Sequence, residues 1–88
     1  MKIKDGYIKF KSYDGWVITP IGNESKKNKV IITLNETAAE IWDMLKEEKD
    51  ADEIAKAFSE KYGISFDRAK NDVSKIVEPL IKKGILTE

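Results

Sequence analysis

The chain has neither cysteine nor histidine among its 88 residues. Without cysteine there are no disulfides and no thiolate metal ligands. Without histidine the commonest general base and the commonest metal ligand are both missing. The five glycines stand singly, so no glycine-rich phosphate loop is present. We therefore expect a non-enzymatic protein with no catalytic residue, no metal and no cofactor.

Net charge is also missing, because 16 Lys and Arg balance 16 Asp and Glu. A strongly basic surface for nucleic acid is therefore not expected. The first ten residues, MKIKDGYIKF, have neither the apolar run nor the cleavage site of a signal peptide. No window approaches the ~20 apolar residues of a membrane span. These absences predict a cytoplasmic protein without a membrane partner.

The N-terminal part of the chain has the alternation of β-strands. Residues 6–22, GYIKFKSYDGWVITPIG, are typical of a hairpin that turns at Asp14-Gly15. Ile8 and Phe10 fall on one face of its first strand. Pro20 marks a strand end or a sheet edge, because proline cannot donate to a ladder.

A polar loop is expected over residues 22–29, GNESKKNK, and a third strand over residues 29–34, KVIITL. Val30, Ile32 and Leu34 would face the helices, whereas Ile31 and Thr33 would point the other way.

The apolar spacing changes to that of helices after residue 34. The first helix is expected over residues 36–47, and either Asn35 caps it or Thr37 and Glu40 form a capping box. The second helix, residues 51–62, follows Asp50 as its cap, with Glu53 placed for a capping box.

A third helix is expected to begin near Ser65 and to end at Gly84. Pro79 lies inside this pattern and should kink or split the helix near Glu78, because it removes the hydrogen bond to the Lys75 carbonyl. A run of strands followed by a run of helices predicts the α+β class. We expect one domain over residues 1–88, a winged helix-turn-helix whose N-terminal wing is a three-stranded antiparallel sheet.

Three blocks in this order carry a family resemblance. They read ITLNETAAEIWDML at 32–45, DADEIAKAFSEKYGI at 50–64 and AKNDVSKIVEPLIKKGIL at 69–86. Together they resemble the family of the pyrroloquinoline quinone biosynthesis chaperone PqqD. The resemblance covers about residues 30–86, and the hairpin before it fits in length and position. Pro79, which follows the usual hydrophobic residue of the third helix, departs from the family pattern.

The resemblance implies a recognition element for ribosomally made peptides that are later modified. Such a domain binds the leader of a precursor peptide and presents it to a partner enzyme, often a radical SAM enzyme or a leader peptidase. The leader adds as a strand to the third strand of the wing and packs against the third helix. The residues expected to bind peptide are Val30, Ile31, Ile32, Thr33, Leu34, Ala69, Asp72, Val73, Lys75, Ile76 and Pro79.

Physical chemistry makes strand addition reasonable, because an edge strand offers unpaired N–H and C=O groups to a second chain. Asn35 would fix where that strand ends relative to the helices. The aliphatic side chains of the strand can equally be core residues, and Asp72 and Lys75 can equally be solvated helix surface. Trp16 either packs on the hairpin or contacts a partner.

Two other readings of the chain remain open. A winged-helix regulator would place the third helix in the major groove of DNA. Against this, residues 66–83 carry a net charge of only +2, from five basic and three acidic residues, and Asn71 is the lone amide there that could read bases. The uncharged run VIITL could also pair with a second copy, so the protein is expected to be a monomer or a weak homodimer.

Overall fold

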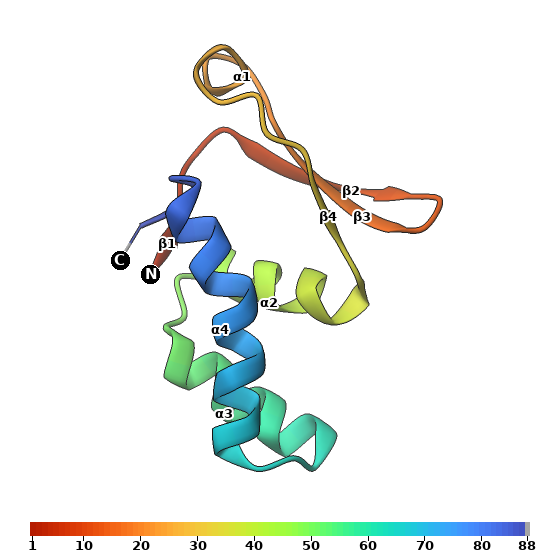
Figure 1. The fold of residues 1–88 in the computed structure, drawn as a ribbon, viewed down its shortest axis with the longest axis vertical. Helices are drawn as coiled ribbons and strands as arrows, with labels where there is room; N and C mark the ends of the chain where they lie inside the picture. The colour runs from red at the N-terminus through yellow and green to blue at the C-terminus, as the bar shows by residue number, and fades with distance from the viewer. Residues whose placement is uncertain (88) are drawn as a thin grey trace.

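The computed structural model describes residues 1–87, arranged as a small sheet above a group of helices (Figure 1). The elements in chain order are β1 (Lys2–Ile3), β2 (Tyr7–Ser12), β3 (Gly15–Pro20), α1 (Glu24–Lys27), β4 (Ile32–Leu34), α2 (Glu36–Lys46), α3 (Ala51–Tyr62), α4 (Phe66–Lys82) and β5 (Leu86–Thr87). The predicted α+β class, with a three-stranded antiparallel sheet before the helices, is confirmed. No helix within residues 1–87 combines the length and the apolar character that crossing a bilayer demands.

The three-stranded sheet has the order β2-β3-β4, with both pairs antiparallel. The expected hairpin is present, and Ser12 pairs with Gly15 at its turn. Strand β4 is shorter than expected, because its ladder with β3 covers only residues 32–34. In this register Val30 would lie opposite Pro20. Proline has no N–H to donate, so the ladder does not extend to this pair.

A second, two-stranded ribbon joins the ends of the described chain. Lys2 pairs with Thr87 and Ile3 pairs with Leu86 in antiparallel register. Ile3 and Leu86 are both buried, so this ribbon closes one end of the core. The sequence pattern does not predict this ribbon, because two-residue strands are too short to show alternation.

The helix boundaries follow the capping residues. The Asn35 side chain accepts a hydrogen bond from the Ala38 N–H at 2.8 Å, which selects Asn35 over the Thr37 alternative as the cap of α2. Asp50 and Glu53 form the predicted capping box of α3, and Gly63 ends that helix with a φ of 64°. The Ser65 hydroxyl caps α4.

Pro79 is predicted to kink or split the third helix, and the split is wrong. Helix α4 runs without interruption from Phe66 to Lys82 with Pro79 inside it. The pyrrolidine ring is exposed on the last turns, where few bonds are lost, and the Pro79 carbonyl still accepts from the Lys83 N–H at 3.0 Å. Packing of the apolar face of α4 therefore outweighs the local preference of proline.

The expected polar loop at residues 22–29 contains a short helix, α1, and a buried carboxylate. Glu24 is only 7% exposed. The Tyr7 hydroxyl donates to its Oε2 at 2.8 Å, and Lys4 lies 3.3 Å from the same oxygen. Because the Tyr7 hydroxyl bonds to the ionised form, it lowers the pKa of Glu24 from the ordinary 4.5.

Asn28 extends this network toward α4. Its side-chain N–H groups donate to the Tyr7 hydroxyl at 2.9 Å and to the Lys83 carbonyl at 3.1 Å. The segment before β4 is thus attached to both the sheet and the end of α4. We call Glu24, Tyr7 and Asn28 the anchoring network.

We predict that Tyr7→Phe lowers the free energy of unfolding by about 1–2 kcal/mol at neutral pH, because the buried Glu24 and the half-buried Asn28 each lose a hydrogen bond. The loss should shrink as pH falls below about 4.5, because a depressed carboxyl pKa stabilises only while the group is ionised. Urea denaturation at pH 7 and pH 3.5 measures both. A loss that stays equal at the two pH values would contradict a role for ionised Glu24.

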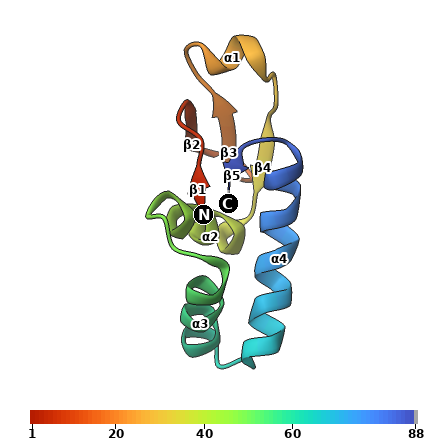
Figure 2. The same cartoon turned by 90° about the vertical axis from the view of Figure 1, so that its left-hand side faces the viewer.

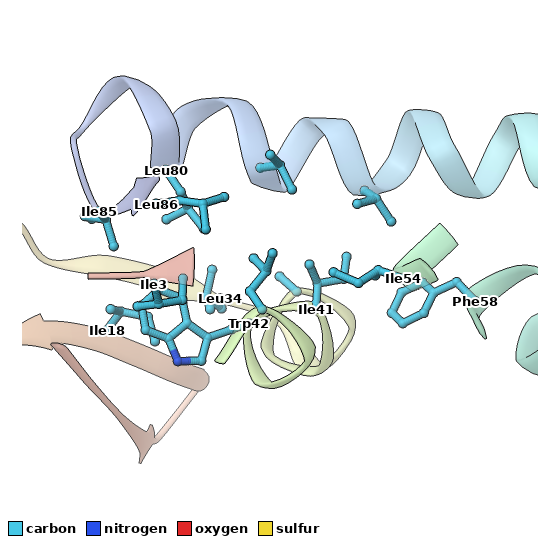
Figure 3. Packing of buried hydrophobic residues seen from close by; sticks show 14 of the residues in the cluster. Ile3, Ile18, Leu34, Ile41, Trp42, Ile54, Phe58, Leu80, Ile85 and Leu86 are labelled. Atoms are coloured by element: carbon cyan, nitrogen blue, oxygen red, sulfur yellow. The ribbon is translucent and has the colours of Figure 1, made fainter. Parts of the chain in front are cut away.

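The core lies between the inner face of the sheet, α2 and α4, and continues down between α3 and α4. Figure 3 shows Leu80 and Leu86 on the α4 side of this core, with Trp42 pointing from α2 toward the sheet. Trp42, Leu45 and Ile54 are almost completely buried. The same layers explain why the helices stay apolar on one stripe only.

The sheet turns Ile8 and Phe10 outward, away from this core, and they are 41% and 45% exposed. Lys9 and Lys11 lie on the inner side, with their ammonium groups 4.3 and 4.9 Å from the centre of the Trp16 ring. Trp16 is therefore a half-buried packing residue of the hairpin, in agreement with the first of its two interpretations.

Candidate peptide-binding groove

A groove of about 180 Å³ lies between the edge strand β4 and the C-terminal half of α4. Figures 1 and 2 both place β4 beside the upper part of α4. The residues that line the groove are Ile32, Thr33, Leu34, Lys75, Ile76, Pro79, Leu80 and Lys83.

One wall of the groove is the open edge of the sheet. Strand β4 pairs with β3 on one side and with no other strand of residues 1–87. Successive side chains of a strand point to opposite faces, yet Ile32, Thr33 and Leu34 all line the groove. The groove therefore runs along the backbone edge itself, where every second residue directs its N–H and C=O outward.

The other wall is one face of α4. The lining residues are spaced by three, four or one positions, as neighbours on a helix face are. Leu80 is buried and forms the floor, Ile76 is half-buried, and the exposed Pro79 forms part of the rim. Because Pro79 has no N–H, it cannot bond to the Lys75 carbonyl, so this wall lacks one bond of the helical ladder.

The structure brings six of the predicted residues together in this groove. They are Ile32, Thr33, Leu34, Lys75, Ile76 and Pro79. Leu80 and Lys83 also line it and were not predicted. Their positions follow Ile76 and Pro79 by four residues, so extending the helical spacing by one turn would have found them.

Two predicted residues, Val30 and Ile31, lie beyond the groove. They line a neighbouring hollow of about 210 Å³ together with Thr19, Pro20, Ser25 and Lys29. Ile31 is 75% exposed, as expected for a side chain that points away from the helices. Residues 30–31 line this hollow and residues 32–34 line the groove, so the two follow one another along the chain.

The remaining predicted residues do not line the groove. Ala69 and Val73 are completely buried in the core, where α4 packs on α3. Asp72 is half-buried on α4 but is not part of the groove wall. The apolar stripe extends over the whole of α4, and Ala69 and Val73 belong to the part of it that is buried in the core.

The rim of the groove is positively charged. Lys75 and Lys83 are exposed lining residues, and none of residues 1–87 that line the groove is acidic. Lys82 joins these two lysines at an adjoining hollow, where Glu78 is the acidic side chain. None of these three lysines forms an ion pair within residues 1–87, whereas seven other lysines do.

The carboxyl groups with lowered pKa values lie outside the groove. Glu24 belongs to the anchoring network, and Glu36 bonds to Lys11, which lowers its pKa. The Glu40 pKa is lowered chiefly by Lys61, which holds α3 against α2. These shifts have structural causes, and none of them concerns a lining residue.

We predict that Pro79→Ala raises the free energy of unfolding by about 1–3 kcal/mol, because the new N–H restores the bond to the Lys75 carbonyl and alanine favours the helix. Denaturation by urea measures the gain. Glu78→Ala, on the neighbouring exposed position, controls for helix propensity alone and should change stability by less than about 0.5 kcal/mol. An equal gain in both variants would show that proline costs this helix nothing.

Comparison with known proteins agrees with the architecture. The family described as "Coenzyme PQQ synthesis protein D (PqqD)" matches residues 15–86. Among curated proteins no match was found. The fold is similar to that of two solved structures. Their sequence identities to this chain, 23% and 20%, are low, so the similarity concerns the fold alone. "TbiB1 in Complex with the TbiA(beta) Leader Peptide" has a TM-score of 0.76 and 23% identity, and covers 98% of this chain and 94% of that chain. "Lasso peptide synthetase B1 complexed with the leader peptide" has a TM-score of 0.76 and 20% identity, and covers 99% and 96%.

Proposed function

Because this chain belongs to the PqqD family, we propose that it binds the leader of a ribosomally made precursor peptide and presents it to a peptide-modifying enzyme. The leader pairs with the free edge of β4 and packs its side chains against α4. The partner enzyme is of the radical SAM or leader-peptidase class. The protein itself contributes binding and orientation and no chemical step.

The single observation that carries this proposal is the groove beside an unpaired strand edge. Main-chain hydrogen bonds to β4 would supply affinity, and side chains of the added strand would enter the groove at every second position. The floor of Ile76 and Leu80 offers an apolar surface to bury there.

The size of the groove limits what can bind. Three residues of β4 offer an edge of about 10 Å, which pairs with a strand of about three to five residues. Docking beyond that length would use the neighbouring hollow at Val30 and Ile31. The two solved structures of similar fold are complexes with leader peptides, which makes a leader peptide the first ligand to test.

The anchoring network supports this role by fixing the groove before any peptide arrives. Asn28 bonds to the Lys83 carbonyl, so the segment leading into β4 is attached to the end of α4. Asn35 caps α2 directly after β4 and fixes the other end of the strand. A pre-organised groove costs less conformational entropy on binding.

An amide NMR titration of the labelled protein tests the proposal. The ligands are synthetic peptides encoded by the short reading frames beside this gene. We expect shifts at residues 30–34 and 75–83, with slower hydrogen exchange at β4. A duplex DNA of unrelated sequence is the control. Shifts along α4 that appear only with DNA and vanish with added salt would overturn the proposal in favour of a winged-helix regulator.

A further inference from the structure

We infer that the segment bound in the groove is acidic, with carboxylates two positions before and two positions after a central apolar residue. This inference rests on the proposed function and specifies the ligand of the same groove. The carboxylates meet Lys83 at one end of the groove and Lys75 at the other, while the apolar residue packs on Ile76 and Leu80.

The first observation is the unpaired charge at this place. Seven of the fifteen lysines have a carboxylate within 4 Å in residues 1–87, and Lys75, Lys82 and Lys83 are not among them. Lys75, Lys82 and Lys83 gather at two adjoining hollows with Glu78 as the acidic neighbour. Three positive charges against one negative charge leave a local excess of two.

The second observation is that, in the described part of the chain, no acidic residue lines the groove. A neutral peptide that covers the groove would remove water from the lysine ammonium groups without supplying an opposite charge to compensate for the lost hydration. A carboxylate at the rim offsets that desolvation and adds Coulomb attraction. The groove therefore favours an acidic segment, because binding of a neutral segment would leave the desolvation of the lysines uncompensated.

The third observation is the spacing of the two lysines. Lys83 directly follows the last residue of α4 and lies eight residues after Lys75, which corresponds to about 12 Å along the helix axis. Residues four apart in a strand are separated by about 13 Å and point to the same side. Two acidic residues at positions i and i+4 of the added strand therefore match the two lysines.

The direction of the groove follows from the anchoring network. Asn28, just before β4, bonds to the Lys83 carbonyl, so Lys83 lies near the start of β4. Lys75 lies two turns earlier on α4 and lines the groove near its other end. Between them Ile76 and Leu80 provide the apolar contact for position i+2.

The test is a selection of random 12-residue peptides displayed on phage, with the intact chain as bait. We expect enrichment of Asp or Glu at positions four apart around an apolar residue. The affinity of a selected peptide should fall at least tenfold for the double variant Lys75→Gln/Lys83→Gln. The double variant Lys46→Gln/Lys56→Gln removes the same charge from exposed positions outside the groove and should leave the affinity unchanged.

The outcomes separate this inference from the function it rests on. Peptides that bind the groove by NMR but show no acidic enrichment would overturn the inference and leave leader binding intact. Equal loss of affinity in the two double variants would overturn it as well, because it would indicate a general charge effect. If no selected peptide shifts the amides of β4 and α4, strand addition itself is wrong and the inference falls with it.

Discussion

Trp42→Ala is expected to lower the free energy of unfolding by about 3–5 kcal/mol, the range for loss of a large aromatic side chain from a core. Trp42 is 2% exposed and points from α2 toward the sheet (Figure 3). Small domains have total stabilities near the lower end of about 5–15 kcal/mol. The variant should therefore be partly unfolded at 25 °C.

The size of this effect comes from the position of Trp42 rather than from its residue type. The indole ring fills space between the sheet and the helices, and the surrounding residues can only partly fill the space it would leave. The lost stability therefore includes a cavity term as well as the transfer free energy. Urea denaturation followed by far-UV circular dichroism measures the loss. The exposed aromatic Tyr13 provides a matched control, and Tyr13→Ala should change stability by less than about 0.5 kcal/mol. A loss below about 2 kcal/mol for Trp42→Ala would contradict this account of the core.

Local signals in the sequence were sufficient where one residue decides a boundary. Asp50 and Glu53 form the predicted capping box at the start of α3, and Gly63 ends the helix in the left-handed conformation. Capping depends on hydrogen bonds within one turn, so the information needed lies within a few residues. The resemblance to the PqqD family, based on three ordered blocks, is confirmed by the family match.

Features that depend on distant residues escaped the sequence analysis. The ribbon of β1 and β5 joins positions 83 and 85 residues apart. Glu24 looked like one more charge in a polar loop, but Tyr7 and Lys4 give it a buried site. No local pattern records such a pairing, because burial of a charge depends on partners that only the fold supplies.

The residues of the candidate groove also differ in how far the sequence could predict them. The strand residues could be placed from their alternation, since one edge of the sheet had to face the helices. On α4 the apolar stripe extends over the whole helix, and its spacing alone cannot tell which turns meet α3. Ala69 and Val73 therefore looked equivalent to Ile76, although they are buried against α3 and Ile76 borders the groove.

Strand β4 has one glycine contact that matters for the groove. A methyl group at Gly15 would lie 2.7 Å from the Leu34 carbonyl oxygen, and Gly15 has a φ of 155°. The hairpin turn and the end of β4 can approach this closely only because position 15 has no side chain. The wall of the groove thus depends on a turn residue that lies outside it.

Ile76→Glu is expected to weaken binding of a leader peptide about 100-fold, or about 2.7 kcal/mol. Ile76 is half-buried between β4 and α4, where an added strand would place an apolar side chain. A carboxylate at this position would have to lose its water when the peptide docks. It would also repel the acidic segment that the groove lysines favour.

The same substitution at Ile81 separates binding from stability. Ile81 lies on the same helix and is also half-buried against the core, but it does not line the groove. Both variants should lose stability to a similar extent, because both bring a charge to the edge of the core. Isothermal titration calorimetry uses the peptide that shifts the amide signals of β4 in the NMR titration. It should show the large loss of affinity for Ile76→Glu only. Equal losses for the two variants would mean that stability controls the affinity and that the peptide does not use the groove.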